Sequence, residues 1–334
     1  MNPFFSIIVP VFNRPDELKE LMISLKNQSF KEFELVVVED GSVEKSEQLL
    51  EEFGKEMKIV YVFQENTGPA IARNKGMEVA MGEYLLFIDS DCIAPDNWLD
   101  SLFKELEKKP VDVFGGPDLA APDFSLQQKA ISFAMTSFFT TGGIRGGKKQ
   151  VDKFHPRSFN MGIHKSVFQD LGGFPVTQMH PGEDMVFTIE IMRRGYKTAL
   201  FSESGVYHKR RNTLKSFYKQ VFKFGKTRYI ISNVYPETAK FLFWIPSLLL
   251  IGALVLLVLS SIVSWFFLIP ILAYMILIFL AAAIPSNCTQ LGLLSVLTSA
   301  IQITAYGLGF LCSVWKVRIR RYDEYKVLEK GFYS

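Results

Sequence analysis

The chain contains no Asp, Glu, Lys, Arg or His between Phe241 and Val314. Three apolar segments lie in this stretch, at Phe241–Ser260, Trp265–Ile284 and Leu291–Val314. Each is close to the roughly 20 residues that an α-helix needs to cross a bilayer, so the sequence predicts three membrane-embedded helices. An ion path or proton relay needs ionisable side chains, so we interpret the stretch as an anchor rather than as a transporter or scaffold.

The charges that flank these segments conflict with three full crossings. Lys240 precedes the segments, and several basic residues follow them: Lys316, Arg318, Arg320 and Arg321. Both groups favour the cytoplasmic side of a membrane. Either one segment is re-entrant or interfacial, or the basic tail lies on the far side, and the sequence leaves both open.

Hydrophobic residues make up 49% of the chain, and before Lys240 they follow an α/β pattern. Short runs rich in β-branched and aromatic residues are typical of buried parallel strands. They lie at Phe4–Val9, Phe33–Val38, Ile59–Phe63 and Tyr84–Ile88. Helical spacing separates them, so we predict βαβ units in a mixed, mainly parallel sheet that binds ligands at the carboxyl ends of its strands.

The part beyond Pro110 is predicted to shape the second substrate's site. It has probable strands near Val111–Gly115 and Ser158–Ile163, and a helix that begins near Glu183. A later helix carries an apolar stripe and a lysine stripe, which is typical of a helix at a membrane surface. The apolar stripe is Leu214, Phe217, Tyr218, Val221 and Phe222, and the basic stripe is Lys215, Lys219, Lys223 and Lys226.

We therefore predict four parts. Residues 1–110 form the first half of the α/β part, and residues 111–235 form its second half, which includes the interfacial helix. Residues 236–315 form about three membrane segments, and residues 316–334 form a basic tail.

Several classes of protein are excluded. The net charge of +3 predicts no nucleic-acid partner. The widely spaced Cys92, Cys288 and Cys312 fit neither a disulfide framework nor a zinc site, which favours a reducing, cytoplasmic setting. Residues 1–12 lack the features of a signal peptide, and no Gly-x-Gly-x-x-Gly follows the first strand, which argues against a dehydrogenase.

Residues 142–148 match Gly-x-x-x-x-Gly-Lys but lack the following Ser or Thr, so we interpret them as a glycine-hinged loop over a charged substrate.

Polar residues follow each of the first four strands. They are Asn13, Glu39-Asp40-Gly41-Ser42, Glu65-Asn66-Thr67-Gly68 and Asp89-Ser90-Asp91. Asp89 and Asp91 are two positions apart, so both carboxylates can reach one hard cation such as Mg²⁺ or Mn²⁺. Such a cation would neutralise charge on a departing nucleotide diphosphate. The alternative for this pair is a solvated turn in which Asp91 caps the next helix. The Glu39–Ser42 segment suits a base or a ribose, or is an ordinary turn.

Two later residues also carry candidate chemistry. Asp184 follows Glu183 at the start of a helical pattern, where it is either a general base for an acceptor hydroxyl or a helix cap. His208 is a third metal ligand, a contact to the diphosphate, or a histidine at a domain boundary.

Taken in order, these motifs resemble family-2 glycosyltransferases over about the first 225 residues. The segments that carry the resemblance are Ile8–Asn13, Glu39–Ser42, Asn66–Ala70 with Arg73-Asn74, Asp89–Asp91 and Gly182–Asp184. The resemblance implies a glycosyltransferase-A fold and inversion at the anomeric carbon, with residues 1–110 as the nucleotide-sugar-binding half and residues 111–235 as the acceptor-binding half. It also implies Asp40 at the nucleobase, Arg73 facing the nucleotide, Asp91 on the metal, His208 near the diphosphate and Asp184 as the base.

The full set of predicted site residues follows from these assignments. Nucleotide binding is predicted for Pro10, Asn13, Glu39, Asp40, Arg73, Asp89 and Ser90. Metal binding is predicted for Asp91, Asp89 and His208, catalysis for Asp184, and acceptor binding for Glu183, Asn160 and Gly162.

One motif departs from the family pattern. Processive members carry Gln-x-x-Arg-Trp, whereas this chain has Gln220-Val221-Phe222-Lys223-Phe224, which favours transfer of a single sugar. The resemblance implies a nucleotide-diphosphate sugar donor and a lipid-linked or glycan acceptor, in the assembly of a lipid-linked or cell-surface polysaccharide. It predicts a multi-pass protein of the plasma (inner) membrane with the catalytic domain in the cytoplasm. An aspartate-dependent phosphotransferase is the rival enzyme, but its Asp-x-Asp would follow the first strand rather than the fourth.

Overall fold

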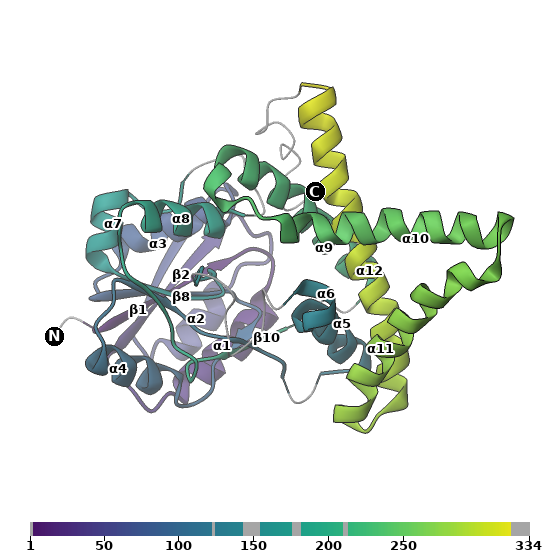
Figure 1. Cartoon of the computed structure of the whole chain (residues 1–334). Helices are drawn as coiled ribbons and strands as arrows, with labels where there is room; N and C mark the ends of the chain where they lie inside the picture. Colours follow the sequence, from purple (N-terminus) through teal and green to yellow (C-terminus); the bar gives the residue numbers. More distant parts are fainter. Residues whose placement is uncertain (1–2, 122–123, 143–153, 176–181, 210–212, 322–334) are drawn as a thin grey trace. The chain divides into compact units, whose positions relative to one another are not determined.

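The computed structural model describes residues 3–121, 124–142, 154–175, 182–209 and 213–321 (Figure 1). These form two compact units. Unit 1 comprises Met1–Ala121, Asp152–Val176 and Glu183–Lys209, and unit 2 comprises Pro122–Val151, Thr177–Gly182 and Arg210–Ser334. Most of the predicted glycine-hinged loop and the end of the predicted basic tail lie outside the described residues, and the predicted four-part division stays a prediction.

Unit 1 is built on a seven-stranded sheet with the order β3-β2-β1-β4-β8-β6-β9. The first four strands are parallel, β8 runs antiparallel to both β4 and β6, and β9 is parallel to β6. Their bounds are β1 Phe5–Val11, β2 Phe33–Asp40, β3 Ile59–Gln64, β4 Tyr84–Ile88, β6 Val113–Gly115, β8 Asn160–His164 and β9 Thr198–Leu200. The predicted mixed, mainly parallel α/β sheet is therefore confirmed.

Helices cover both faces of this sheet because successive strand residues point to opposite sides. On β1, Ile7 and Val9 join one buried cluster, whereas Ile8 joins the other. The first cluster includes α1 (Pro15–Lys26), α2 (Glu47–Phe53) and α4 (Trp98–Lys108). The second includes α3 (Pro69–Val79), α7 (Lys165–Leu171) and α8 (Glu183–Arg193).

A second, three-stranded sheet in unit 1 has the order β5-β10-β7. It consists of β5 (Cys92–Ile93), β10 (Val206–His208) and β7 (Asp118–Leu119). Its central strand β10 pairs antiparallel with β5 and parallel with β7. This pairing joins the segment after β4 to residues more than a hundred positions later in the chain.

Unit 2 is helical in its described part. It contains α5 (Leu126–Thr136), α6 (Phe138–Thr141), α9 (Leu214–Val234), α10 (Ile245–Ile262), α11 (Ile269–Ser286) and α12 (Thr289–Val314). Together with short 3₁₀ and π turns, the last three make apolar helices that are long enough to cross a membrane, at Phe241–Ile262, Trp265–Ser286 and Thr289–Ile319. The long apolar helices that follow the α/β domain are thus as predicted.

The apolar stripe predicted on α9 packs against protein. Phe217 and Val221 are fully buried, and they share a cluster with Ala305 of α12 and Ile131 of α5. These two side chains therefore do not reach lipid. Contact of the lysine stripe with a membrane surface stays a prediction.

The packing of α9 on α12 depends on glycine. A Cβ atom built on Gly309 would lie 2.1 Å from the carbonyl oxygen of Phe222, and one built on Gly225 would lie 2.2 Å from that of Tyr306. Backbone oxygens cannot move aside as flexible side chains can. The absence of a side chain at these two positions is what lets the two helices approach closely.

We therefore expect Gly309→Ala to destabilise unit 2 by about 1–3 kcal/mol, because it overpacks a backbone contact. Gly252→Ala is the matched control, since a Cβ there meets no atom within 4 Å. Thermal unfolding of the detergent-solubilised protein, followed by tryptophan fluorescence, compares the two variants. Equal melting temperatures would contradict the role given to Gly309.

Candidate active site

The segment that follows β1 connects the ends of two neighbouring strands. The backbone amide of Asn13 donates to Oγ of Ser42 at 2.8 Å, and the side-chain Oδ1 of Asn13 accepts from the backbone amide of Val43 at 2.8 Å. The next residue, Arg14, donates from Nη1 to Asp91 Oδ2 at 2.8 Å. Asn13 and Arg14 therefore tie the end of β2 to the end of β4, as expected for strands that flank β1 in the sheet.

Glu39 and Asp40 are buried and hold the loops around them. Glu39 Oε2 accepts from the Ser46 amide at 2.8 Å. Asp40 Oδ1 accepts from the Thr67 amide, and its Oδ2 accepts from the Gly68 amide, each at 2.9 Å. These bonds fix the loops after β2 and β3. The predicted contacts of both residues with a nucleotide stay predictions.

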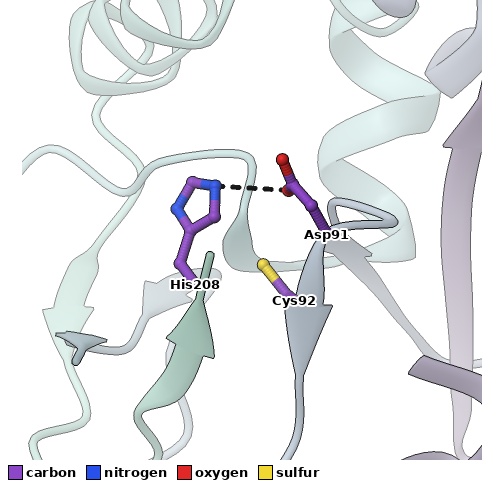
Figure 2. Close-up of side chains that lie close together, drawn as sticks. All are labelled: Asp91, Cys92 and His208. Atoms are coloured by element: carbon purple, nitrogen blue, oxygen red, sulfur yellow. Dashed lines mark ion pairs between the residues drawn. The ribbon is translucent and has the colours of Figure 1, made fainter. Parts of the chain in front are cut away.

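Asp91 and His208 lie side by side at the end of β4 (Figure 2). The strand pairing explains this, because His208 on β10 is opposite Cys92 on β5 and Asp91 directly precedes Cys92. His208 Nε2 is 3.3 Å from Asp91 Oδ1, and its ring stacks on Phe159. The small sheet therefore brings together two of the three residues predicted to bind metal.

The charges of this pair stabilise each other. Burial alone would raise the pKa of Asp91, but His208 and Arg14 outweigh it and hold that pKa well below the usual range. Burial alone would lower the pKa of His208, but Asp91, Asp118 and Asp89 outweigh it and raise that pKa above 6.5. Without a metal, the site thus favours an ionised aspartate beside a protonated histidine.

Cys92 completes a group of three potential ligands whose atoms lie within 4.8 Å of one another (Figure 2). Its thiol is buried, and burial raises its pKa well above 9.0, with the neighbouring carboxylates acting in the same direction. The thiol therefore stays protonated, whereas only a thiolate binds metal well. We assign Cys92 to packing, and metal binding by Asp91 and His208 stays a prediction.

The geometry of Asp91 and His208 fits a divalent cation. Two cis ligands at about 2.1 Å from one octahedral ion lie about 3 Å apart. The observed separation of 3.3 Å between His208 Nε2 and Asp91 Oδ1 is close to that value. Arg14 occupies the other oxygen, Oδ2, so it orients the carboxylate without blocking the oxygen that faces His208.

Arg73 links Asp89 to the start of α8. Its side chain is 4% exposed, with Nη2 at 2.8 Å from Asp89 Oδ1 and Nη1 at 3.3 Å from Glu183 Oε1. The guanidinium also lies over the ring of Phe174. Arg73 therefore joins Asp89, after β4, to Glu183, which is about a hundred residues later in the chain.

Asp184 lies at the first turn of α8, next to Glu183. Its Oδ1 accepts from the Met185 amide at 2.7 Å, and its Oδ2 lies 3.4 Å from Arg157 Nη1. The carboxylate is 18% exposed. Asp184 is the second residue of α8, and its bond runs to the adjacent amide rather than to an amide two or three residues on, as an N-cap bond does. The carboxylate is partly exposed, and its role as the base stays a prediction.

The other predicted residues are placed as follows. Asn160 is buried, and its amide accepts from Trp98 Nε1 at 3.3 Å and donates to the Ser204 carbonyl at 2.8 Å. Gly162 faces the ring of Phe114 within the sheet, where a Cβ would lie 2.1 Å from that ring. Ser90 is buried and Pro10 half-buried. The acceptor and nucleotide roles of these four residues stay predictions.

Four residues of the site were not predicted. Arg14 follows Asn13 directly, so its position at a strand end was a usable signal. Cys92 is similarly next to Asp91. Asp118, whose Oδ1 is 4.0 Å from His208 Nδ1, and Arg157, beside Asp184, depend on pairings between distant segments that no local pattern in the sequence reveals.

Residues 6–172 match the family model described as "Glycosyl transferase family 2", which is half of the chain. Among curated proteins, the chain is 32% identical over 118 residues to glycosyltransferase GlyG of Streptococcus pneumoniae, covering 35% of this chain and 39% of GlyG. It is 25% identical over 199 residues to glycosyltransferase AglE of Haloferax volcanii, covering 58% of this chain and 63% of AglE. The chain thus spans less than two thirds of the length of these relatives.

Among solved structures, the chain resembles the mannosyltransferase PcManGT from Pyrobaculum calidifontis, determined in complex with GDP-Man and Mn²⁺. The TM-score is 0.64 at 16% sequence identity, and the match covers 95% of this chain and 88% of PcManGT. At this identity the likeness establishes a shared glycosyltransferase-A-like fold.

We expect Mn²⁺ affinity to fall as the pH is lowered, because His208 must lose its proton before it can bind metal. Since the pKa of His208 is raised, the loss begins above pH 6.5 and approaches about tenfold per pH unit below that pKa. Asp91 stays ionised over this range and adds no slope. Isothermal titration calorimetry with Mn²⁺ between pH 6 and 8.5 measures the effect.

Two variants control this measurement. His208→Gln should bind Mn²⁺ more weakly and lose the pH slope, whereas Cys92→Ala should keep both the affinity and the slope. An unchanged slope in His208→Gln would remove His208 from the ligand set.

Proposed function

The chain belongs to glycosyl transferase family 2, and from this premise we propose that it transfers one sugar from a nucleotide-diphosphate sugar to an acceptor hydroxyl, with inversion at the anomeric carbon. The observation that carries the proposal is the joining of distant acidic residues at the carboxyl end of β4. Asp91 pairs with His208, and Arg73 joins Asp89 to Glu183 beside Asp184.

We assign the donor diphosphate to the Asp89–Asp91 segment. Arg14, Arg73 and protonated or metal-bound His208 place positive charge at this point, which suits a diphosphate. Asp91 and His208, with Asp89, would hold Mg²⁺ or Mn²⁺, and PcManGT, which shares the fold, contains Mn²⁺ together with its nucleotide sugar. When bound, such an ion neutralises negative charge on the leaving diphosphate.

We assign the nucleoside to the loops after β1, β2 and β3. Asn13, Glu39 and Asp40 fix the shape of these loops through bonds to their backbone amides. A rigid loop at the carboxyl end of a parallel sheet is where nucleotides bind in open α/β folds. In this assignment Arg73 does not contact the nucleotide but positions Asp89, because its guanidinium is enclosed by Asp89 and Glu183.

We assign the general base to Asp184. The acceptor hydroxyl oxygen attacks the anomeric carbon as the bond from that carbon to the diphosphate oxygen breaks, and the leaving diphosphate takes the bonding electrons. The Asp184 carboxylate accepts the hydroxyl proton. Arg157 and the Met185 amide hold the carboxylate in place, and its partial exposure leaves room for an acceptor.

We further propose a lipid-linked or glycan acceptor and a role in assembling a lipid-linked or cell-surface polysaccharide. Three helices that are apolar and long enough to cross a membrane support membrane association, which would keep the enzyme beside such an acceptor. Lys240 before these helices and the basic residues after them support a catalytic unit on the cytoplasmic side of the plasma (inner) membrane.

The proposal is tested with the detergent-solubilised chain and a panel of nucleotide-diphosphate sugars, with and without Mn²⁺. We expect one nucleotide diphosphate to raise the melting temperature in a metal-dependent manner, and the matching donor to release that nucleotide. Phosphate trapped covalently on Asp89, with no release of nucleotide diphosphate from any donor, would refute sugar transfer.

Two substitutions separate the assigned roles. Asp184→Asn should bind donor with unchanged affinity but transfer sugar at least about 10²-fold more slowly, since a general base contributes about 10²–10⁴-fold. Asp91→Asn should lose metal-dependent donor binding. Calorimetric donor binding and single-turnover transfer measure both effects.

Glu190→Gln is the matched control, because Glu190 also lies on α8 but pairs with Arg193 on the helix surface. It should leave binding and transfer unchanged. Normal transfer by Asp184→Asn would refute the base assignment without affecting the donor site.

A further inference from the structure

Helices α10 and α11 pack on one side of α12. Gly292 of α12 lies against Phe279 of α11, where a Cβ would come within 2.7 Å of the ring. Further along α12, the carbonyl of Gly307 accepts from Oγ of Ser247 on α10 at 3.2 Å. The end of α11 and the start of α10 are thus both attached to α12, at two separate points along it.

Helices α5 and α9 pack on another side of α12. Thr298 Oγ1 donates to the Ala130 carbonyl of α5 at 2.8 Å, and Gly309 lies against Phe222 of α9. At about 100° per residue, positions 292 and 307 lie about 60° apart around the helix and positions 298 and 309 about 20° apart. The centres of the two pairs differ by about 140°, so α12 lies between the α10–α11 pair and the lysine-bearing α9.

The far ends of α10 and α11 are exposed and meet each other (Figure 1). Ile262, Val263 and Trp265, at this junction, are 73%, 64% and 62% exposed. Each helix has 18 residues, or about 27 Å at 1.5 Å per residue. This length is close to the roughly 30 Å of hydrocarbon in a bilayer, so each helix is long enough to cross it.

The three apolar helices differ in burial. α10 and α11 are the most apolar and have few buried residues, whereas α12 is the least apolar and the most buried of the three. Ser295, Thr298 and Ser299 of α12 are buried within unit 2. A helix that packs polar side chains against protein on one side and supports an apolar hairpin on the other is suited to the bilayer surface.

The basic residues that precede and follow the apolar region both lie near the carboxyl-terminal end of α9. Arg318, just after α12, donates to the Tyr229 hydroxyl at 3.0 Å and to Asn233 Oδ1 at 3.3 Å. These two residues are in the last turns of α9, shortly before Lys240. A chain that leaves a membrane where it entered has crossed it an even number of times, so three full crossings do not fit.

We propose that α10 and α11 form a hairpin that crosses the bilayer and returns, and that α12 lies along the headgroups of the entry face without crossing. Lys240 and the basic residues that follow α12 then share one face, which satisfies the preference of both groups for the cytoplasm. The exposed apolar side chains of α12 lie between its hairpin side and its α9 side, where they are available to lipid at the headgroup level: Leu293, Leu297, Leu308, Trp315 and Ile319. The bound partner is therefore the lipid of one leaflet, with an anionic surface favoured by the neighbouring cations.

Sided cysteine labelling in sealed vesicles of both orientations tests the proposal. The background is the full chain with Cys288 and Cys312 replaced by alanine, with the buried Cys92 retained. Single cysteines replace Lys240, Ser264, Asn287 and Arg320, and a membrane-impermeant maleimide is applied. We expect positions 240, 287 and 320 to react from one side and position 264 from the other.

Other patterns overturn the proposal. Reaction of position 320 from the side of position 264 means three full crossings, and reaction of positions 240 and 264 from one side means that α10 does not cross. Labelling in detergent confirms that each cysteine is reactive. Green fluorescent protein or alkaline phosphatase fused after residue 334 reports the side of the chain end independently, because the first is active inside and the second outside. The outcome does not depend on sugar transfer.

Discussion

The candidate site depends on placing several carboxylates together at the end of one strand, which is costly unless cations are placed with them. Asp89, Asp91 and Glu183 are each matched within the fold by Arg73, Arg14 or His208. A partly buried carboxylate without such a partner would take up a proton and lose its charge. The low pKa of Asp91 and the raised pKa of His208 are two sides of this balance. In the proposed function, Arg14 and His208 are the cations available to an incoming diphosphate, because Arg73 is enclosed.

The cationic partners of these carboxylates differ in whether they can lose their charge. Arg73 is enclosed, with both terminal nitrogens engaged, so it belongs to the framework that holds β4 and α8 together. Removing one member of such a buried set leaves an uncompensated charge, which costs about 3–5 kcal/mol. His208 is different because it can lose its proton, which the proposed role as a metal ligand requires. The site thus combines a fixed arginine with a histidine whose charge can change.

Much of unit 1 could be predicted because its signals are local. The runs at β1 to β4 are continuous in sequence, and the rule that parallel strands place their carboxyl ends on one edge located Asn13, Asp40 and Asp91. The pairing of β10 with β5 could not be predicted, since each strand has three residues or fewer and their partners are distant in the chain. His208 was found by residue type, and its partner Asp118 was missed. The contacts of Arg73 with Asp89 and Glu183 likewise depend on tertiary packing.

The helical part shows a different limit of sequence reasoning. By composition and length, α10, α11 and α12 each qualify as membrane-crossing helices, because a window of residues records how apolar a helix is but not what covers it. Gly225, Gly307 and Gly309 carry the missing information, since they allow backbones to approach where any side chain would collide. Their meaning emerges only when the opposing helix is known. The same applies to α9, whose apolar stripe suits a lipid surface or a protein surface equally well, and of which Phe217 and Val221 pack on α12 and α5. Distinguishing a membrane span from a buried helix therefore requires the contacts that each face makes.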